Sequence, residues 1–248
     1  MRVIIDGDTI AVATAATTEE ADTPYIACAR AQTMIEGICA ACESTDLEIW
    51  LSGKNNFRYA VYPEYKANRI GAKRPRWERD VKDFMVHEFN ANWATGEADD
   101  QCGIRLIECP NAILAHIDKD LDQITGWHYS WPIVRKGEIV RPARKYYIPP
   151  DQADYFFWFQ LLTGDPTDNI KGAGGVGKVK ATEILNGLTT NEEMYEAVKP
   201  YFSCDEELDM NAQCVFIWRK ENDNWKNLLP QLLDYQTGGQ LEDYKDLS

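Results

Sequence analysis

The 248-residue sequence lacks any apolar run approaching the ~20 residues that a membrane-spanning helix needs. Its N-terminal residues include Asp6 and Asp8, carboxylates at positions where a secretory signal would continue its apolar stretch. We therefore expect a cytoplasmic protein with no membrane association. With 44% hydrophobic and 11% aromatic residues, the chain is typical of a globular protein, and it is long enough to bury a sizeable core.

The sequence also lacks a complete zinc-binding pattern. Cys39 and Cys42 have zinc-like spacing, but no second CxxC or HxxxH pair accompanies them, and the nearest histidine is His87. Together with Cys28, these cysteines lie in a small-residue, apolar stretch of helical composition, where cysteine packs as a small hydrophobic residue. We expect them to be buried free thiols.

Charge is distributed unevenly along the chain. The formal charge of −14 argues against nonspecific coating of nucleic acid. Nine basic and three acidic residues nevertheless lie between Lys54 and Lys82, a local surplus of six (nine minus three), and a second basic stretch covers 135–145. A metal-dependent nuclease needs such a basic strip beside concentrated carboxylates, although a solvated charged face would explain either feature alone.

Short apolar segments alternate with segments of helical composition. This alternation predicts an α/β fold over residues 1–150, with a mostly parallel central sheet flanked by helices. From residue 151 to 248 the pattern predicts a smaller helical lobe with acidic C-terminal helices. The expected strands are 2–5, 47–51 and 112–117; the expected helices are 24–44 with Thr23 as N-cap, 76–90, 96–110, 151–162 and a helix ending near 185; 55–75 is irregular.

Carboxylates recur where apolar strands end and where helices begin, at the edge where open α/β sheets place their ligands. They form four clusters: Asp6 and Asp8; Glu97, Asp99 and Asp100; Asp118, Asp120 and Asp122; Asp165 and Asp168. Converging like charges repel unless cations neutralise them. Oxygen donors without histidine or cysteine indicate Mg²⁺ or Mn²⁺. We expect Asp8 and Asp122 to support or cap rather than to bind metal.

These motifs resemble the flap-endonuclease superfamily, which includes the 5′→3′ exonucleases of tailed phages and the 5′-nuclease domain of bacterial DNA polymerase I. The resemblance covers roughly Arg2 to Leu185, and the motifs occur in the family's order. They are Ile5-Asp6-Gly7, the Tyr-Lys-Arg segment 63–69, the acidic helix start 96–100, the acidic strand end 118–120, the acidic pair in 164–170, and the glycine hairpin 172–180.

The resemblance implies a PIN-like 5′-nuclease core with a basic arch segment at about 54–95, and a helix–three-turn–helix lobe that grips duplex DNA. The implied activity is metal-dependent 5′→3′ exonuclease and flap-endonuclease cleavage of DNA to 5′-phosphate products, in phage-type DNA replication or recombination. The implied partner is DNA with a 5′ end, nick or flap, the enzyme is expected to be a monomer, and RNA primers are left open as substrates.

The resemblance also assigns roles to individual residues. Lys66 and Arg69 would clamp the scissile phosphate, and Tyr65 would stack on the terminal base. The set implied to hold two Mg²⁺ or Mn²⁺ ions is Asp6, Glu97, Asp99, Asp100, Asp118, Asp120, Asp165 and Asp168. The hairpin residues implied to bind DNA are Gly172, Gly175, Gly177, Lys178 and Lys180, with a K⁺ ion at the hairpin.

Two local features depart from known patterns. Ser52 stands where the family usually has an aspartate, which predicts weaker binding at one metal position. The stretch 172–178 nearly matches a phosphate-binding P-loop, but Val179 replaces the Mg²⁺-binding Ser or Thr and no apolar strand precedes it, so we reject an NTPase.

Two other functions stay open. A PIN-like endoribonuclease would share the acidic strand ends but usually lacks the duplex-gripping hairpin at 172–180. A non-catalytic protein that binds DNA structures is kept open by Ser52, although unneutralised carboxylates would only repel DNA.

Overall fold

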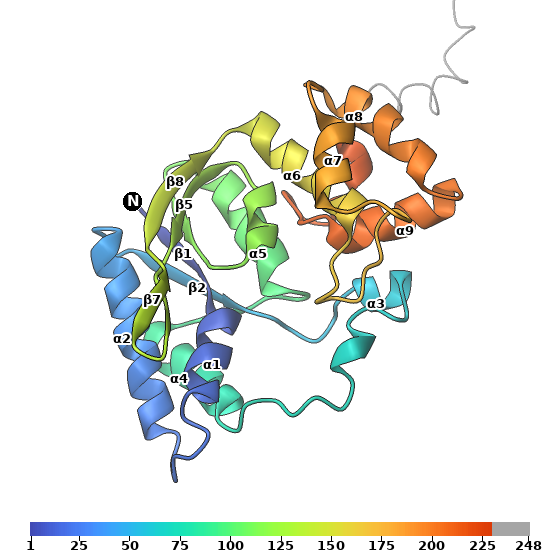
Figure 1. Ribbon diagram of the computed structural model, residues 1–248. Helices are drawn as coiled ribbons and strands as arrows, with labels where there is room; N and C mark the ends of the chain where they lie inside the picture. Colours follow the sequence, from blue (N-terminus) through green and yellow to red (C-terminus); the bar gives the residue numbers. More distant parts are fainter. Residues whose placement is uncertain (230–248) are drawn as a thin grey trace, which may run out of the picture.

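The computed structural model describes residues 1–229 of the chain (Figure 1). Within these residues, a six-stranded sheet has the order β3-β2-β1-β4-β5-β8, and all its neighbours run parallel except β5 and β8. The strands are β1 Val3–Asp6, β2 Leu47–Leu51, β3 Asn92–Trp93, β4 Ile113–Ala115, β5 Gly126–Ser130 and β8 Arg144–Ile148. The predicted mostly parallel central sheet is confirmed.

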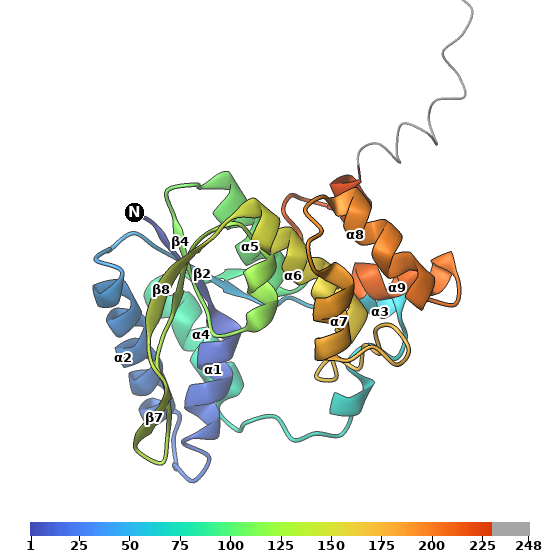
Figure 2. The ribbon, with the colours of Figure 1, turned by 45° about the horizontal axis from the view of Figure 1, so that its top comes forward.

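Helices cover both faces of this sheet (Figures 1 and 2). On one face lie α1 Gly7–Ala16, α2 Tyr25–Ala41 and α4 Glu78–Phe89; on the other lie α5 Ala98–Glu108 and the short 3-10 helix η2 Lys119–Gln123. Val3 and Ile5 pack under the first group, whereas Ile4 packs with Cys102 and Leu106 of α5. Burial on both faces explains why β1 is a continuous apolar run rather than an alternating one.

Several local predictions need correction. Helix α2 begins at Tyr25 with Pro24 at its N-cap position and no side-chain cap, so Thr23 is not the cap. Helix α1, which follows Asp6 directly, was not predicted. Strands β5 and β8 were also missed, as was the separate hairpin of β6 Ile133–Arg135 and β7 Glu138–Arg141, which carries part of the second basic stretch.

All seven cysteines are free thiols, which was the expectation for Cys28, Cys39 and Cys42. Cys42 is buried in the core of the sheet domain, whereas Cys28 and Cys39 are only half-buried. Burial therefore holds for one of the three cysteines for which it was predicted.

The second part of the chain forms a helical lobe beside the sheet domain (Figures 1 and 2). Its elements are α6 Pro150–Thr163, α7 Lys178–Leu185, α8 Asn191–Val198, η3 Lys199–Tyr201, α9 Asp205–Val215 and η4 Trp225–Leu228. Phe157 and Trp158 lie at its centre, and Tyr65 from the predicted arch segment is buried in the same core. Residues 230–248, the last part of the predicted lobe, lie outside the described residues.

An extended strap links the two parts of the molecule. It runs from helix α3 Arg58–Val61 and the 3-10 helix η1 Ala67–Arg69, beside the lobe, to the start of α4 (Figures 1 and 2). Ile70 and Lys73 in this strap line a cavity of about 670 Å³. No helix among residues 1–229 is both long enough and apolar enough to cross a membrane.

Candidate functional site

Seven of the eight predicted metal ligands line one cavity of about 470 Å³. They come from the ends of β1 and β4, the start of α5 and the loop after α6, and we call them the acidic cluster. Its members are Asp6, Glu97, Asp99, Asp118, Asp120, Asp165 and Asp168. The cluster forms here because β1 and β4 are parallel neighbours, so that their carboxyl ends meet at one edge of the sheet.

Local hydrogen bonds orient the two strand-end carboxylates. Asp6 caps α1, accepting the N–H of Asp8 at 3.1 Å and the hydroxyl of Thr9. Asp118 caps η2 in the same manner and accepts the N–H of Asp120 at 3.0 Å. Each carboxylate uses one oxygen to start a helix, which fixes its direction at the edge of the cavity.

The loop after α6 presents the last acidic pair. Asp165 accepts the N–H of Thr167 at 2.7 Å, and its backbone bridges to Ile170. Gly164 has φ +67°, and a Cβ there would lie 2.4 Å from the carbonyl oxygen of Ile170. Glycine is therefore required at this position, because a side chain would force the loop apart.

The inner carboxylates of the cluster are Asp6, Asp99 and Asp118. In the described part of the chain, lysine and arginine pair with Glu97 and with the outer aspartates, but not with Asp6, Asp99 or Asp118. Burial, and then repulsion from neighbouring aspartates, raises the pKa of Asp6 to about 7 and also raises the pKa of Asp99. This set of buried and half-buried oxygen donors fits a hard divalent cation, which would remove the repulsion.

Three basic side chains neutralise the outer members of the cluster. Lys66 contacts Glu97 and lies 3.5 Å from Asp168, which also pairs with Arg69. Lys119 lies 3.1 Å from Asp120 and 3.3 Å from Asp165.

The pKa values of these paired carboxylates follow from their partners. Burial opposes ionisation of Glu97, but Arg58 and Lys66 outweigh it and lower its pKa. At Asp120, burial and Asp118 prevail over Lys119 and raise the pKa to about 7. Asp120 therefore has a raised pKa, like Asp6 and Asp99, although it has a lysine partner.

Tyr65 does not fit the predicted stacking role. The residue is only 2% exposed, and its hydroxyl lies 2.9 Å from both Glu97 and Asp168. It orients carboxylates instead of presenting its ring. Lys66 has a left-handed backbone with φ +55°, so it and Arg69 do not share a helical face; they converge through Asp168.

Asp100 is the predicted ligand that lies apart from the cavity. Both its oxygens accept from the guanidinium of Arg58, at 2.6 and 2.8 Å, and one also accepts the N–H of Trp218 at 3.2 Å. The structure thus replaces its predicted metal role with an internal ion pair. Sequence reasoning missed Arg58 because it is 42 positions distant.

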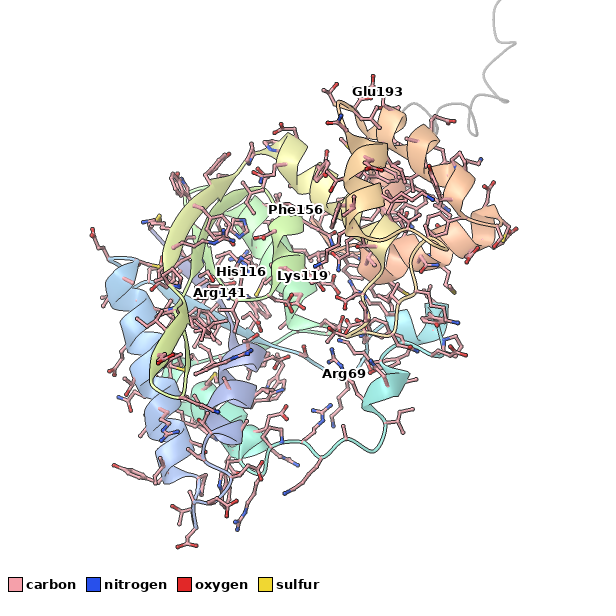
Figure 3. The ribbon with its side chains drawn as sticks, in the orientation of Figure 1. Arg69, His116, Lys119, Arg141, Phe156 and Glu193 are labelled. Atoms are coloured by element: carbon pink, nitrogen blue, oxygen red, sulfur yellow. The ribbon has the colours of Figure 1, made fainter. Side chains whose placement is uncertain are left out.

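A basic groove adjoins the acidic cavity. This is the 670 Å³ cavity beneath the strap, and the two cavities share Asp8, Val12, Ser52, Lys66, Arg69 and Glu97. The basic side chains that line the groove are Lys54, Lys66, Arg69, Lys73, Arg74 and Lys82. Figure 3 shows Arg69 on the strap side and Lys119 on the sheet-domain side of this region.

Ser52 lies between the two cavities and makes two structural hydrogen bonds. Its hydroxyl accepts the N–H of Ala98 at 3.0 Å, and its own N–H donates to Asp8 at 3.1 Å. Asp8 also lies 2.8 Å from the ammonium of Lys82. Asp8 thus supplies a carboxylate next to Ser52. Its partner Lys82 also pairs with Glu78, four residues earlier on α4, and sequence reasoning missed this helical spacing.

The glycine hairpin presents open backbone on the lobe. A Cβ at Gly172 would lie 2.3 Å from the amide nitrogen of Gly164, whereas a Cβ at Gly175 or Gly177 would meet nothing within 4 Å. Gly172 is therefore needed for packing, and the other two leave the hairpin accessible. Lys178, at the start of α7, and Lys180 are both exposed.

No protein-family model matches the chain. DNA polymerase I of Bacillus caldotenax is 25% identical over 185 residues, covering 66% of this chain and 20% of that protein. A 5′-3′ exonuclease of Buchnera aphidicola is 27% identical over 163 residues, covering 61% of this chain and 55% of that protein. The chain therefore spans about a fifth of the length of the first of these relatives and about half of the second.

Two crystal structures of the D15 protein of bacteriophage T5 share the fold. One, co-crystallised with metal ions, has a TM-score of 0.66 at 17% identity and covers 86% of this chain and 88% of that one. The other, a flap-endonuclease complex with DNA and metal ions, has a TM-score of 0.59 at 17% identity and covers 94% and 97%. These comparisons confirm the resemblance that the motifs indicated, and the fold is that of a 5′ nuclease.

Proposed function

We propose that the chain is a metal-dependent 5′→3′ exonuclease and flap endonuclease that hydrolyses DNA phosphodiesters to 5′-phosphate products, in phage-type DNA replication or recombination. One observation carries this proposal: among the described residues, buried Asp6 and half-buried Asp99 and Asp118 have no cationic partner, although they lie next to a groove of six basic side chains. Unneutralised carboxylates would repel a phosphate, so the two features are compatible once cations are bound.

The acidic cluster is the proposed ligand set, holding two Mg²⁺ or Mn²⁺ ions, directly or through water. When bound, the ions supply a nucleophilic water and neutralise charge on the phosphate. Asp100 is left out of this set because Arg58 occupies both its oxygens.

Lys66 and Arg69 are the residues that we propose to hold the scissile phosphate. Both now contact Asp168, and the side chain of Arg69 is 48% exposed, so it can turn to a phosphate and bind it with two N–H groups. When Arg69 turns from Asp168 to the phosphate, the Asp168 carboxylate becomes free to bind a metal ion. Tyr65 positions Glu97 and Asp168 from behind.

The glycine hairpin is the proposed site for duplex DNA. Its accessible backbone at Gly175 and Gly177, together with Lys178 and Lys180, suits a phosphate backbone, with K⁺ bound by hairpin carbonyls. Gly172 supports the turn. The basic groove would take the single strand, and we further propose a cytoplasmic monomer that also accepts RNA primers.

The two alternative functions are less well supported. An endoribonuclease of the PIN-like class would not need the accessible hairpin, which occupies the lobe near α7. A non-catalytic DNA-binding protein would gain nothing from the unpaired aspartates of the acidic cluster, because they oppose binding.

The test is digestion of duplex, nicked and 5′-flap DNA that carries a 5′ label, with Mg²⁺ and with a chelator. We expect labelled mononucleotides or flaps to be released only with the metal, and no release by Asp118→Asn. A matched single-stranded RNA of the same sequence distinguishes an endoribonuclease. Tight flap binding without cleavage in saturating Mg²⁺ or Mn²⁺ would instead support the non-catalytic reading.

A further inference from the structure

Two histidines face each other inside the sheet domain, behind the acidic cluster. His116 directly follows β4, and His128 lies in β5; Figure 3 shows His116 within the sheet domain. Both are buried, with exposures of 1% and 0%. The Nε2 atom of His116 lies 2.9 Å from the Nδ1 atom of His128.

Backbone carbonyls fix the position of the proton on each ring. The Nδ1 atom of His116 lies 2.6 Å from the carbonyl oxygen of Asp118, and the Nε2 atom of His128 lies 2.8 Å from that of Ile124. A carbonyl oxygen can only accept, so each of these nitrogens must carry a hydrogen. A neutral imidazole has one N–H, and the two nitrogens that face each other therefore both present lone pairs.

The two facing nitrogens lie beside the hydroxyl of Tyr146. The nearest hydroxyl, on Tyr146, lies 2.7 Å from Asp122 and 3.4 Å from His116, so its single proton goes to the carboxylate. Within residues 1–229, the two buried nitrogens, 2.9 Å apart, are thus left without a donor.

We propose that His116, His128 and Asp122 bind a transition-metal ion of the zinc class. The ligand atoms of these three residues all lie within 4.8 Å of one another, and Asp122 Oδ1 is 3.9 Å from the Nε2 atom of His116. In the tetrahedral geometry that zinc prefers, two nitrogens at about 2.05 Å from the ion are roughly 3.3 Å apart, so the rings would need to separate by only about 0.4 Å. Two imidazoles and a carboxylate favour Zn²⁺ over Mg²⁺.

The neighbouring groups also fit this assignment. The N–H groups that point away from the ion are held by the carbonyls of Asp118 and Ile124, the orientation that metal-binding histidines usually have. Arg144, which stacks on Tyr146 at 4.1 Å, opposes a dication, and Asp122 offsets that charge.

The ion would have a structural consequence for the neighbouring turn. It would join the turn after β4 to β5 and, through His116, hold the carbonyl of Asp118, from which η2 starts. The inference does not depend on the proposed nuclease activity.

The metal content of the intact protein tests the proposal directly. The full chain is refolded with Zn²⁺, dialysed into excess Mg²⁺ so that oxygen-donor sites are filled, and analysed by mass spectrometry. We expect about one equivalent of Zn²⁺ to remain, and Co²⁺ in its place to show visible absorption without thiolate charge-transfer bands. Loss of all Zn²⁺ in Mg²⁺, or thiolate bands that place the ion on cysteines, would overturn the proposal.

Variants locate the ion. His128→Gln keeps a donor for the carbonyl of Ile124 but removes a ligand, and it should lose the retained Zn²⁺. His87→Gln is the matched control, because His87 is exposed on α4 and lies outside the site. Retention of Zn²⁺ by a folded His128→Gln would refute the assignment. If that variant does not fold, the wild-type melting temperature decides: it should rise with Zn²⁺ beyond the rise given by Mg²⁺, and an equal rise would count against the site.

Discussion

Arg58 and Asp100 form a buried, two-point ion pair that joins the helical lobe to the sheet domain. The guanidinium donates to both oxygens of Asp100, and it also donates to the carbonyls of Cys214 at 2.9 Å and Phe216 at 2.7 Å. Arg58 is 1% exposed and also lies 3.2 Å from Glu97, so its charge depends on these internal partners. The pair therefore connects α3, the start of α5 and the end of α9.

We expect Asp100→Asn and Arg58→Ala to unfold more easily than wild type by about 3–5 kcal/mol, because each leaves a buried group without its partner. Urea unfolding monitored by tryptophan fluorescence measures the difference. Arg2→Ala is the control, since Arg2 also pairs with two carboxylates but its side chain is 38% exposed; that change should have a much smaller effect, because solvent screens exposed ion pairs. An unfolding free energy of Asp100→Asn equal to that of wild type would remove the structural role.

Asp118→Asn and Asp120→Asn should have opposite effects on cleavage and on DNA binding. Each removes a proposed ligand but also relieves repulsion of phosphate, so cleavage should be lost while flap DNA binds as well as before or more tightly. Single-turnover cleavage in saturating Mg²⁺ and binding in Ca²⁺ measure the two effects. Asp151→Asn, at an exposed position on α6, is the matched control and should cleave normally. Wild-type rates in Asp118→Asn would exclude it as a ligand.

The acidic cluster should make stability of the metal-free protein depend on pH. Asp6 has a raised pKa of about 7, whereas an unfolded aspartate has about 3.9. The folded protein thus binds the extra proton between these values, and this contribution to stability is lost as pH rises through the folded pKa. Buried His116 and His128 have lowered pKa values and act in the opposite direction, so the effect must be isolated by a variant.

Comparison with Asp6→Asn isolates it, since both histidines are kept. From about pH 5 to about pH 7.5 in a chelator, wild type should lose a few kcal/mol of unfolding free energy relative to the variant. Mg²⁺ should reduce that difference at the higher pH. Parallel pH profiles of the two proteins in the chelator would show that Asp6 is not perturbed.

Much of this site could be predicted because its motifs are local. Asp6 and Asp118 each end a strand and start a helix, and β1 and β4 are parallel neighbours, so short segments were enough to bring them together. Asp100 was misassigned because adjacent residues on a helix point about 100° apart, so Asp99 and Asp100 cannot both face the cavity. Which of them does so depends on Arg58, 42 positions away.

Other features depend on packing that no local pattern records. Tyr65 was predicted to stack on a base, but its ring fills the core of a lobe whose other residues begin at α6. Its hydroxyl reaches Asp168, 103 positions along the chain. Strand β8 was missed because it is largely exposed, and β5 was missed because its last three residues are all buried, so neither strand alternates cleanly.

Lys178→Ala should weaken duplex binding and leave the chemical step nearly unchanged. Lys178 is exposed at the start of α7 and does not line the acidic cavity, so it can position the duplex but not the scissile bond. Binding titrations and single-turnover rates at saturating DNA separate these effects, with exposed Lys220→Ala as the control. A fall of more than ~100-fold in the saturated rate, roughly 2.7 kcal/mol, would place the hairpin in the active centre.

The last prediction concerns Ser52, where the chain departs from the family. The Ser52 hydroxyl accepts the N–H of Ala98, and a carboxylate at this position could accept it as well. Ser52→Asp should therefore fold, and the added anionic oxygen should shift the Mg²⁺ dependence of cleavage to lower concentration. Maximal rate need not change, because saturating metal fills the site in both proteins. Ser52→Asn introduces a neutral side chain of the same size as aspartate, and it should leave the Mg²⁺ dependence of cleavage unchanged.

The competing explanation is that Asp8 already serves this metal position. Its carboxylate accepts the N–H of Ser52 and pairs with Lys82. If Asp8 already serves this metal position, a second carboxylate beside it adds repulsion and no affinity. Asp8→Asn would then shift the Mg²⁺ titration strongly to higher concentration, whereas Ser52→Asp would leave it unchanged or shift it the same way. That pair of results would reject a weak site at Ser52 and make Asp8 a ligand. A shift of the Mg²⁺ titration to lower concentration for Ser52→Asp, with little change for Asp8→Asn, would instead show that the missing carboxylate weakens metal binding.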